Sequence, residues 1–343
     1  MTTIGLMGFG RIGRNVFRNV YKRDDIRIGA IADLADATSM EYLLKFDTLV
    51  GRFPDELSIR DGHLYVYGRR IACLAGQERG AIPPWGALGV DIVLEATARQ
   101  IGRAGLQKHL DAGAKRVILC APPVEPLDLT VVMGINDHML AREHRIVSNG
   151  SSTIHGIAHV ARTLLEAFGI EKLLFTTVHS YGSAHRLADV PHEDMRRGRS
   201  APENIIPQES RSAGMLAQLL PELTGRVAGS AMNVPVPNGS AVDLVCWHGT
   251  KVKVDDINEV IRTAASSRFP GILRYETEPI VSSDIAHSTY SGIFDSKATM
   301  VLGDKLSKTL TWFDSGWGFS HRAVDVVERF MQLDAAAAAE VSS

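Results

Sequence analysis

Three glycines near the start of the chain have a spacing that suits phosphate binding. Gly8, Gly10 and Gly13 form a G-x-G-x-x-G pattern that follows a short apolar run and opens a helical pattern. The first permits a tight turn, the second lets the backbone approach a pyrophosphate, and the third lets the helix pack closely on the strand. Asp33, at the end of the next apolar run, can accept ribose hydroxyls and repels a 2′-phosphate. This context favours a dinucleotide site for NAD rather than NADP over a glycine-rich turn that binds nothing.

A serine and a histidine in the middle of the chain have side chains suited to nucleophilic or acid–base chemistry. His179 ends a predicted strand, and a neutral imidazole accepts a hydroxyl proton near neutral pH. The alternative for His179 is a structural hydrogen bond alone. Ser152 lies at the predicted N-terminus of a helix, with Ser151 as its candidate N-cap. Capping alone favours serine there, so three roles stay open for Ser152: nucleophile, hydrogen-bond donor or helix cap.

Two histidines four residues apart follow on the same predicted helix. His155 and His159 share a polar stripe with Arg162 and Glu166. Such a pair can bind zinc, but the glutamate of an H-E-x-x-H motif is missing. We therefore expect a solvated or interface face here and no metal site.

The elements that must position these residues fall into two regions. Up to Gly150, short apolar runs alternate with helical patterns, which predicts βαβ units and a doubly wound parallel Rossmann sheet. Beyond it, an amphipathic helix at Thr153–Phe168 and several strand-like segments predict an α+β region with a mostly antiparallel sheet. A long polar loop covers residues 180–206, a helix is expected from about Phe319 to Leu333, and an alanine-rich flexible tail covers residues 334–343.

The predicted strands are short apolar runs between these helices. In the first region they are Ile4–Met7, Ile26–Ala32, Ile92–Glu95, Arg116–Cys120, Leu129–Met133 and Ile146–Ser148. In the second region they are Leu173–Val178, Val227–Val234, Ala241–Trp247 and Lys308–Trp312.

Length and composition limit the classes of protein to consider. At ~100–200 residues per domain, 343 residues indicate about two domains. The formal net charge is −2 without a long basic run, which disfavours nucleic-acid and membrane partners. The start of the chain lacks the basic region of a secretory signal. The three cysteines, Cys73, Cys120 and Cys246, are widely spaced, which disfavours a disulfide framework and favours a reducing cytoplasm.

Several motifs together resemble the glyceraldehyde-3-phosphate dehydrogenase family, from about Thr3 to Leu333. They are Gly5–Arg14, Lys115–Pro122, Thr176–His179, Asn204–Pro207, Leu220–Leu223, Val234–Asn238, Ser240–Leu244 and Trp317–Arg322.

The resemblance implies NAD as cofactor, a small-molecule substrate and a homotetramer. It implies a Rossmann domain of residues 1–150 and 317–333, and a catalytic domain of residues 151–316 whose S-shaped loop is 180–206. It makes His179 the base and implies cofactor contacts at Gly8, Gly10, Arg11, Ile12, Gly13, Asp33, Arg79, Thr97, Cys120 and Ser315. Cys120 also has a plainer interpretation, as a small buried core residue.

The resemblance breaks at the nucleophile. The family's catalytic cysteine position is Ser152 here, and its second cysteine position is Gly156. The family mechanism needs a thiolate that forms a hemithioacetal, and then a thioester that phosphate cleaves. A serine hydroxyl is far less acidic than a thiol, whose pKa is ~8.5, and an ester resists phosphate better than a thioester. Efficient phosphorylating oxidation is therefore not expected.

Other positions implied by the resemblance have changed as well. The arginine expected to hold the substrate phosphate is Asn233, and two threonines beside it are Gly182 and Ala184. Ser315 replaces the asparagine that holds the nicotinamide amide, and Phe319 replaces a tyrosine. An anion site is better kept, because Ser151 and Thr153 match, Ser210 stands in for a threonine and Arg211 replaces a glycine. For the loop arginines Arg196, Arg197 and Arg199, the family's use of this segment favours interface ion pairs, with anion binding second.

Three functions remain. The first is NAD-dependent hydride transfer on a small aldehyde, polyol or hydroxy acid, with His179 as base. The second is non-redox acyl transfer or hydrolysis by a Ser152–His179 dyad. The third is a catalytically silent, NAD-binding regulatory homologue. The changed nucleophile, phosphate and nicotinamide positions support the third function, whereas the retained histidine and anion site weigh against it. We rank the three functions in the order given.

Overall fold

The computed structural model describes residues 1–76, 78 and 80–342. The chain divides into two compact units, which are described separately. The first unit consists of Met1–Ser151 together with the segment from Ser320 onward, and the second unit is Ser152–Phe319.

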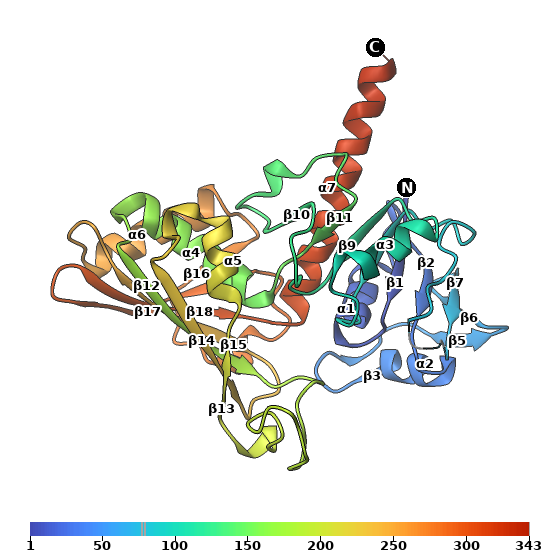
Figure 1. The fold of residues 1–343 in the computed structure, drawn as a ribbon, viewed down its shortest axis with the longest axis horizontal. Helices are drawn as coiled ribbons and strands as arrows, with labels where there is room; N and C mark the ends of the chain where they lie inside the picture. The colour runs from blue at the N-terminus through green and yellow to red at the C-terminus, as the bar shows by residue number, and fades with distance from the viewer. Residues whose placement is uncertain (77, 79, 343) are drawn as a thin grey trace. The chain divides into compact units, whose positions relative to one another are not determined.

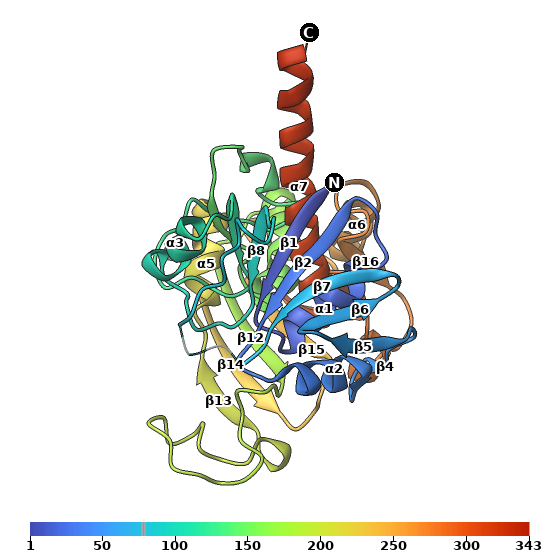
Figure 2. The same ribbon diagram turned by 90° about the vertical axis from the view of Figure 1, so that its right-hand side faces the viewer.

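The first unit is built on a nine-stranded sheet with the order β10-β11-β9-β8-β1-β2-β7-β6-β5. Seven neighbouring strands are parallel, as Figure 2 shows for β1, β2, β7 and β8, which confirms the predicted Rossmann sheet. They are β1 (Thr2–Met7), β2 (Ile26–Ala32), β7 (Arg69–Leu74), β8 (Ile92–Glu95), β9 (Arg116–Leu119), β10 (Leu129–Thr130) and β11 (Ile146–Ser148). An antiparallel hairpin of β5 (Leu57–Arg60) and β6 (His63–Val66) extends one edge. Strands β8 and β9 are buried along their whole length, as central parallel strands are.

Helices and a small hairpin complete the first unit. They are α1 (Arg11–Val20), α2 (Ala37–Lys45), α3 (Arg103–Asp111), the short 3₁₀ helix η1 (Asp137–Met139) and the β3–β4 hairpin (Phe46–Asp47, Gly51–Arg52). The last helix, α7, spans Trp317–Ser342, belongs to this unit from Ser320 onward, and is drawn in red in Figure 1. It continues nine residues beyond Leu333, so the expected flexible tail is helical through Ser342. The run of alanines accounts for this difference, because alanine has the highest helix propensity.

The second unit has a seven-stranded sheet with the order β13-β14-β12-β15-β18-β17-β16. Four of its six strand pairs are antiparallel, which confirms the prediction, and β12/β14 and β16/β17 are parallel. The strands are β12 (Lys172–Ser180), β13 (Ile206–Glu209), β14 (Val227–Val234), β15 (Ser240–Trp247), β16 (Leu273–Glu276), β17 (Gly292–Leu302) and β18 (Leu306–Phe313). The helices are α4 (Ser152–Phe168), α5 (Ser212–Leu219), α6 (Val254–Ser267) and the 3₁₀ turns η2 (Ala201–Glu203), η3 (Pro221–Leu223) and η4 (Ser282–Ile285).

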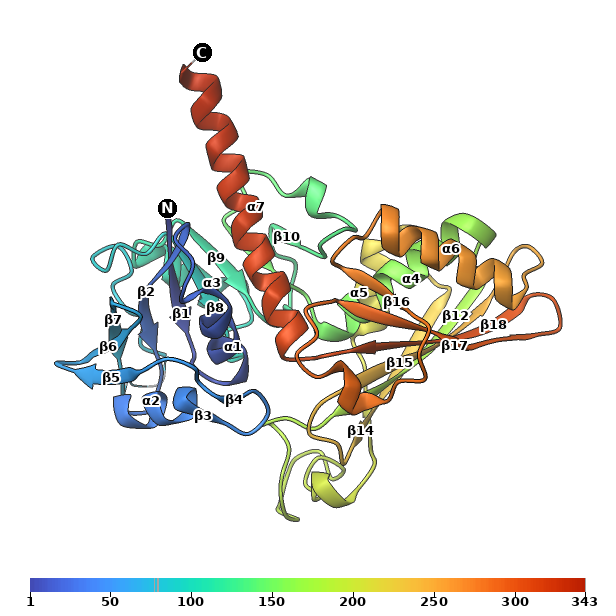
Figure 3. The ribbon, with the colours of Figure 1, turned by 180° about the vertical axis from the view of Figure 1, so that it is seen from behind.

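The helices α4, α5 and α6 lie along one face of this sheet (Figure 3). On β12, the alternate residues Leu173, Phe175 and Thr177 are buried. Because side chains of a strand alternate between its faces, His179 continues this row. The catalytic candidate His179 therefore lies on the same face as the buried row. Among the described residues, none of the helices is long and apolar enough to span a membrane.

Candidate functional site

The glycine pattern forms the turn between β1 and α1, and each glycine meets a different steric demand. Gly8 has a φ of +95°, in the left-handed region that favours glycine. A Cβ on Gly13 would lie 2.1 Å from the carbonyl oxygen of Gly8, so only glycine allows the helix to approach so closely. A Cβ on Gly10 would meet open space, which leaves room beside the turn for a ligand. The N-cap of α1 is Gly10, which offers no side chain to its first N–H groups. These features fit a pyrophosphate at the helix N-terminus.

Asp33 follows β2 directly and is tied to the same turn. Its Oδ2 accepts the N–H of Phe9 at 2.6 Å, and its Oδ1 accepts the N–H of Ala35 at 2.9 Å. A carboxylate has about four acceptor positions, so two remain for ribose hydroxyls. The carboxylate therefore fits the role predicted for NAD, and it also joins the end of β2 to the glycine turn.

The turn after β8 lies beside the glycine turn, as Asp33 does. A Cβ on Gly8 would lie 2.9 Å from Cγ2 of Thr97, so this turn packs on the first glycine of the pattern. Cys120 follows β9 and is buried, and burial together with the charge of Glu95 raises the pKa of its thiol to about 12. Arg11 and Ile12 are the first residues of α1. Arg79 lies outside the described residues.

The catalytic candidates of the second unit are connected through one phenylalanine. Ser152 is the first residue of α4, and Gly156 lies one turn later. A Cβ on Gly156 would be 3.0 Å from Cδ1 of Phe313, so the helix rests directly on this ring. The His179 ring meets Phe313 edge-on, with centroids 5.9 Å apart and planes at 88°. Phe313 thus sets the spacing between the start of α4 and the end of β12, a role that no sequence pattern indicates.

The orientation of His179 follows from its hydrogen bonds. Its Nδ1 lies 3.0 Å from the carbonyl oxygen of Ser180. A carbonyl oxygen only accepts, so Nδ1 carries the proton and the lone pair of the neutral ring is on Nε2. Ser240 Oγ, which is fully buried, lies 3.5 Å from Nδ1 and accepts the N–H of Ser180 at 3.1 Å. The sequence analysis named Ser240 only as part of a family motif and missed its contact with His179, because the two residues are distant in the chain.

The predicted anion-site residues occur at the starts of two helices that pack together, α4 and α5. Ser151 and Thr153 flank the first residue of α4, whereas Ser210 and Arg211 come directly before α5. Ser210 Oγ accepts the N–H of Ser212 at 3.3 Å, and the side chain of Arg211 is exposed.

Asn233 is paired with His179 across the β12/β14 ladder, so it is adjacent to the base. Its side chain is only 2% exposed, its Oδ1 accepts from Nε2 of Gln208 at 3.4 Å, and its Nδ2 has no partner within the described chain. A short buried amide at this position brings no positive charge to the site.

Ser315, the predicted nicotinamide contact, belongs to the second unit, in the turn between β18 and α7. Asp314 organises this turn, because its Oδ1 accepts the N–H groups of Gly316 and Trp317 at 2.9 and 2.7 Å. The Ser315 side chain is half-buried.

The expectation of a solvated histidine stripe on α4 is wrong. His155 and His159 are 1% and 0% exposed. The His155 ring packs edge-on against Phe319 at 5.9 Å, and the His159 ring packs against Phe269 at 4.9 Å. Helical periodicity separated the polar residues from the apolar ones, but packing covers both faces of this helix from Thr153 to Ala161, and only the later part of the stripe, at Glu166, is exposed.

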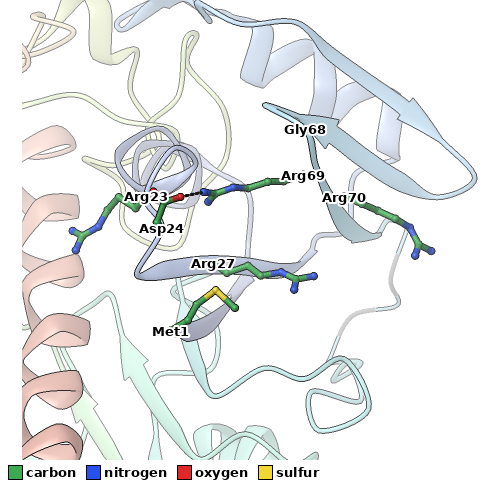
Figure 4. A pocket seen from close by; sticks show the side chains of 7 residues that line it. All are labelled: Met1, Arg23, Asp24, Arg27, Gly68, Arg69 and Arg70. Carbon is green, nitrogen blue, oxygen red and sulfur yellow. Dashed lines mark hydrogen bonds and ion pairs between the residues drawn. The ribbon is translucent and has the colours of Figure 1, made fainter.

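Two hollows contain arginines. The first, of about 340 Å³, is drawn in Figure 4 and is lined by Met1, Arg23, Asp24, Arg27, Gly68, Arg69 and Arg70. Arg69 pairs with Asp24 at 2.9 Å, and Arg23 pairs with Asp25 and Glu328. It lies at the N-terminal ends of the parallel strands, whereas the glycine turn follows the C-terminal end of β1. This hollow is therefore not part of the dinucleotide site.

The second hollow, of about 840 Å³, lies beside β13 and β14. Arg196, Arg197 and Arg211 are among its lining residues. The third loop arginine, Arg199, pairs with Asp189 of the same loop at 3.0 Å, so its charge is already balanced within the chain.

Comparisons with known proteins agree with this geometry. Residues 2–103 match the model of the glyceraldehyde 3-phosphate dehydrogenase NAD binding domain, and residues 151–315 match that of the C-terminal domain. The glyceraldehyde-3-phosphate dehydrogenase of Geobacillus stearothermophilus is 44% identical over 324 residues, covering 94% of this chain and 96% of that protein. Those of Mycobacterium tuberculosis (strain ATCC 25618 / H37Rv) and Priestia megaterium are each 42% identical, over 94% and 95% of this chain and 97% of each relative.

The two units define a two-domain, NAD-dependent dehydrogenase. The chain belongs to the glyceraldehyde-3-phosphate dehydrogenase family. Its cofactor is NAD, and the residues around the glycine turn fit that group.

Proposed function

We propose that this protein oxidises or reduces a small aldehyde, polyol or hydroxy acid by hydride transfer, with His179 as the base, and that it is not an efficient phosphorylating dehydrogenase. The observation that carries this proposal is the hydrogen bond between Nδ1 of His179 and the Ser180 carbonyl oxygen at 3.0 Å. It leaves the lone pair on Nε2, which is the arrangement a general base needs. Ser240 supports the same ring orientation.

The remaining groups complete a simple oxidation. NAD, when bound, supplies the hydride acceptor. His179 takes the proton of the substrate hydroxyl while the carbon–hydrogen bond is broken, so a secondary alcohol becomes a ketone or an aldehyde hydrate becomes an acid. Ser152 donates a hydrogen bond to the substrate oxygen, and the N-terminus of α4 favours the charge that develops there.

The chemistry of the cysteines supports the exclusion of thioester formation. Burial raises the pKa of the thiol to about 11 in Cys73 and to about 12 in Cys120 and Cys246. Because the thiolate is the reactive form, these three thiols are almost wholly protonated and therefore poorly nucleophilic near neutral pH. With Ser152 at the nucleophile position, a thioester for phosphate to cleave has no sulfur donor in this site.

We also propose that the site residues are those named from the sequence, and that the protein is a cytoplasmic homotetramer. The two other functions remain as alternatives. A Ser152–His179 dyad for acyl transfer is supported by the same tautomer of His179, which suits a hydroxyl nucleophile as well as a substrate hydroxyl. A silent NAD-binding protein is supported by the buried, uncharged Asn233.

The test is a panel of small aldehydes, polyols and hydroxy acids, with NADH formation or consumption as the readout. We expect turnover of at least one compound, and a loss of about 10²-fold or more in His179→Ala, which removes the general base. His138→Ala is the matched control, because His138 is a histidine of η1 in the other unit. Tight NAD binding without turnover contradicts the proposal and favours the silent homologue. Acylation of Ser152 by a serine-directed probe favours the non-redox dyad.

A further inference from the structure

A buried row of polar side chains runs through the first unit to the turn that follows β8. Trp85 Nε1 donates to Nδ1 of His109 at 2.9 Å, and Nε2 of His109 lies 3.2 Å from Oε2 of Glu95. All three side chains are 0% exposed. Buried polar groups are costly unless each is hydrogen-bonded, and here every step of the row is made. The motifs of the cofactor site do not account for this row.

The proton positions in the row are determined by its first member. An indole N–H can only donate, so Nδ1 of His109 must be the acceptor and Nε2 carries the ring proton. Nε2 therefore donates to Glu95. The N–H of Trp85 therefore fixes the tautomer of His109 and holds its ring with Nε2 toward the carboxylate.

The other oxygen of Glu95 organises the turn itself. Its Oε1 accepts the N–H of Thr97 at 2.8 Å and also the hydroxyl of Thr97. The same hydroxyl oxygen accepts the N–H of Arg99 at 3.2 Å. Ala98 between them has a φ of +52°, an uncommon conformation for a residue with a side chain. Such a conformation persists only where surrounding contacts impose it, and the carboxylate supplies two of them.

This turn is in contact with the glycine pattern. A Cβ on Gly8 would lie 3.0 Å from the backbone N of Thr97 and 2.9 Å from its Cγ2. A shift of Thr97 would therefore press on the turn that receives the pyrophosphate. The charge of Glu95 also reaches Cys120, where it contributes to the raised pKa of the thiol at the end of the neighbouring strand.

We propose that Glu95, held by His109 and Trp85, is a positioning residue for NAD: it fixes the turn Ala96–Arg99 against Gly8 and thereby shapes the cofactor site. This inference rests on the proposed place of Thr97 in that site. Glu95 does not touch the cofactor in this scheme; it acts through Thr97.

The decisive test depends on which atom donates and which accepts in each hydrogen bond of the row. In Glu95→Gln, one end of the new amide must present its NH₂ group to a donor, either Thr97 or Nε2–H of His109. His109 could resolve this conflict by moving its proton to Nδ1, but Trp85 prevents that. In the double variant with Trp85→Phe, the imidazole is free to change tautomer, so its Nε2 can accept a hydrogen bond from the NH₂ group of the new amide.

The measured quantity is the Kd for NAD, obtained by calorimetric titration without any substrate. The effect of Glu95→Gln on this Kd should depend on whether Trp85 is present. Glu95→Gln alone should raise the Kd for NAD at least about tenfold, and the same change in the Trp85→Phe background should raise it by no more than about threefold. Thr97→Val leaves Trp85, His109 and Glu95 intact and should also raise the Kd for NAD. This variant provides a test that does not depend on whether the double variant folds.

The control is Leu106→Ala, a fully buried position of α3 in the same unit that is not part of the row. It should lower the melting temperature and leave the Kd for NAD unchanged, which separates positioning from general loss of stability. An unchanged Kd for NAD in Glu95→Gln and in Thr97→Val overturns this inference but not the cofactor site. An equal effect of Glu95→Gln in the wild type and in the Trp85→Phe background does the same. A wild-type protein that binds no NAD overturns the cofactor site and this inference with it.

Discussion

Gly156 packs directly against Phe313, so that a Cβ at position 156 would lie 3.0 Å from the phenylalanine ring. The ring of Phe313 also contacts His179, edge-on, with the two ring centroids 5.9 Å apart. Phe313 is 1% exposed and has little room to move away. The start of α4 and the proposed base are therefore mechanically linked through one side chain.

A larger residue at position 156 should disturb both stability and the base. In Gly156→Cys, the added side chain overlaps Phe313, and overpacking of a filled core costs about 1–3 kcal/mol. We expect the free energy of unfolding, measured in urea, to fall by about that amount. The turnover number should fall as well, because the displaced ring moves His179. An unchanged free energy of unfolding would show that Phe313 can relax. Gly214→Ala in α5 is the control, because a Cβ there meets open space.

Replacement of Ser152 by cysteine should create the one reactive thiol of the protein. Wild-type Cys73, Cys120 and Cys246 are held as thiols by burial, so iodoacetamide at neutral pH should leave the native protein unmodified. In Ser152→Cys, the thiol lies at the first residue of a helix, which lowers its pKa, and mass spectrometry should find a single added carbamidomethyl group on that residue. Because Cys73 is only half-buried, Cys73→Ser is the matched control. Rapid modification of the wild-type protein would contradict the assigned burial.

Asp33 should have separable effects on cofactor choice and on local structure. Asp33→Asn loses the charge and keeps one acceptor oxygen, which can accept the N–H of Phe9 while the new NH₂ group faces the N–H of Ala35. We therefore expect a weaker preference for NAD over NADP and a small loss of stability. Asp33→Ala loses both the charge and the acceptor oxygen, and an unpaired buried donor costs about 1–3 kcal/mol. Titration with both dinucleotides and urea unfolding measure the two effects. Equal stability loss in the two variants would mean that the hydrogen bond to Phe9 contributes nothing.

His321 on α7 should make the protein less stable in mild acid. Burial and the neighbouring Arg322 lower the pKa of this histidine from 6.5 to about 4. The unfolded chain therefore binds the proton first, so the stabilising contribution is complete above pH 6.5 and is lost as the pH falls from there to about 4. Asp325, whose pKa burial raises to about 6, changes stability in the opposite direction over the same range.

The contribution of the histidine is isolated by comparing the wild type with His321→Asn. Urea unfolding between about pH 7 and about pH 4, the interval that spans the unfolded and folded pKa values, should show that the wild type loses more stability than the variant. Parallel pH profiles for the two proteins would contradict the prediction, because both retain Asp325.

Some of this protein could be predicted from the sequence because the signals are local. The bounds of the strands Ile26–Ala32, Ile92–Glu95, Ile146–Ser148 and Val227–Val234 match the prediction. The edge strands β5 and β6 were missed, since they are short, partly exposed and carry charged residues such as Arg60. The glycine turn was predicted because strand, turn and helix follow each other directly in the chain.

The sequence by itself determined which residues are available for chemistry: the glycine pattern, Asp33, His179, and serine in place of a thiol at position 152. Only the tertiary structure decided how they are held. Phe313, Ser240 and the row from Trp85 through His109 to Glu95 act through contacts between residues far apart in the chain, and His155 and His159 are buried by packing that their own helix does not encode. Periodicity reports which side of an element is apolar, but not which other segment covers it, because that depends on the closure of the whole fold.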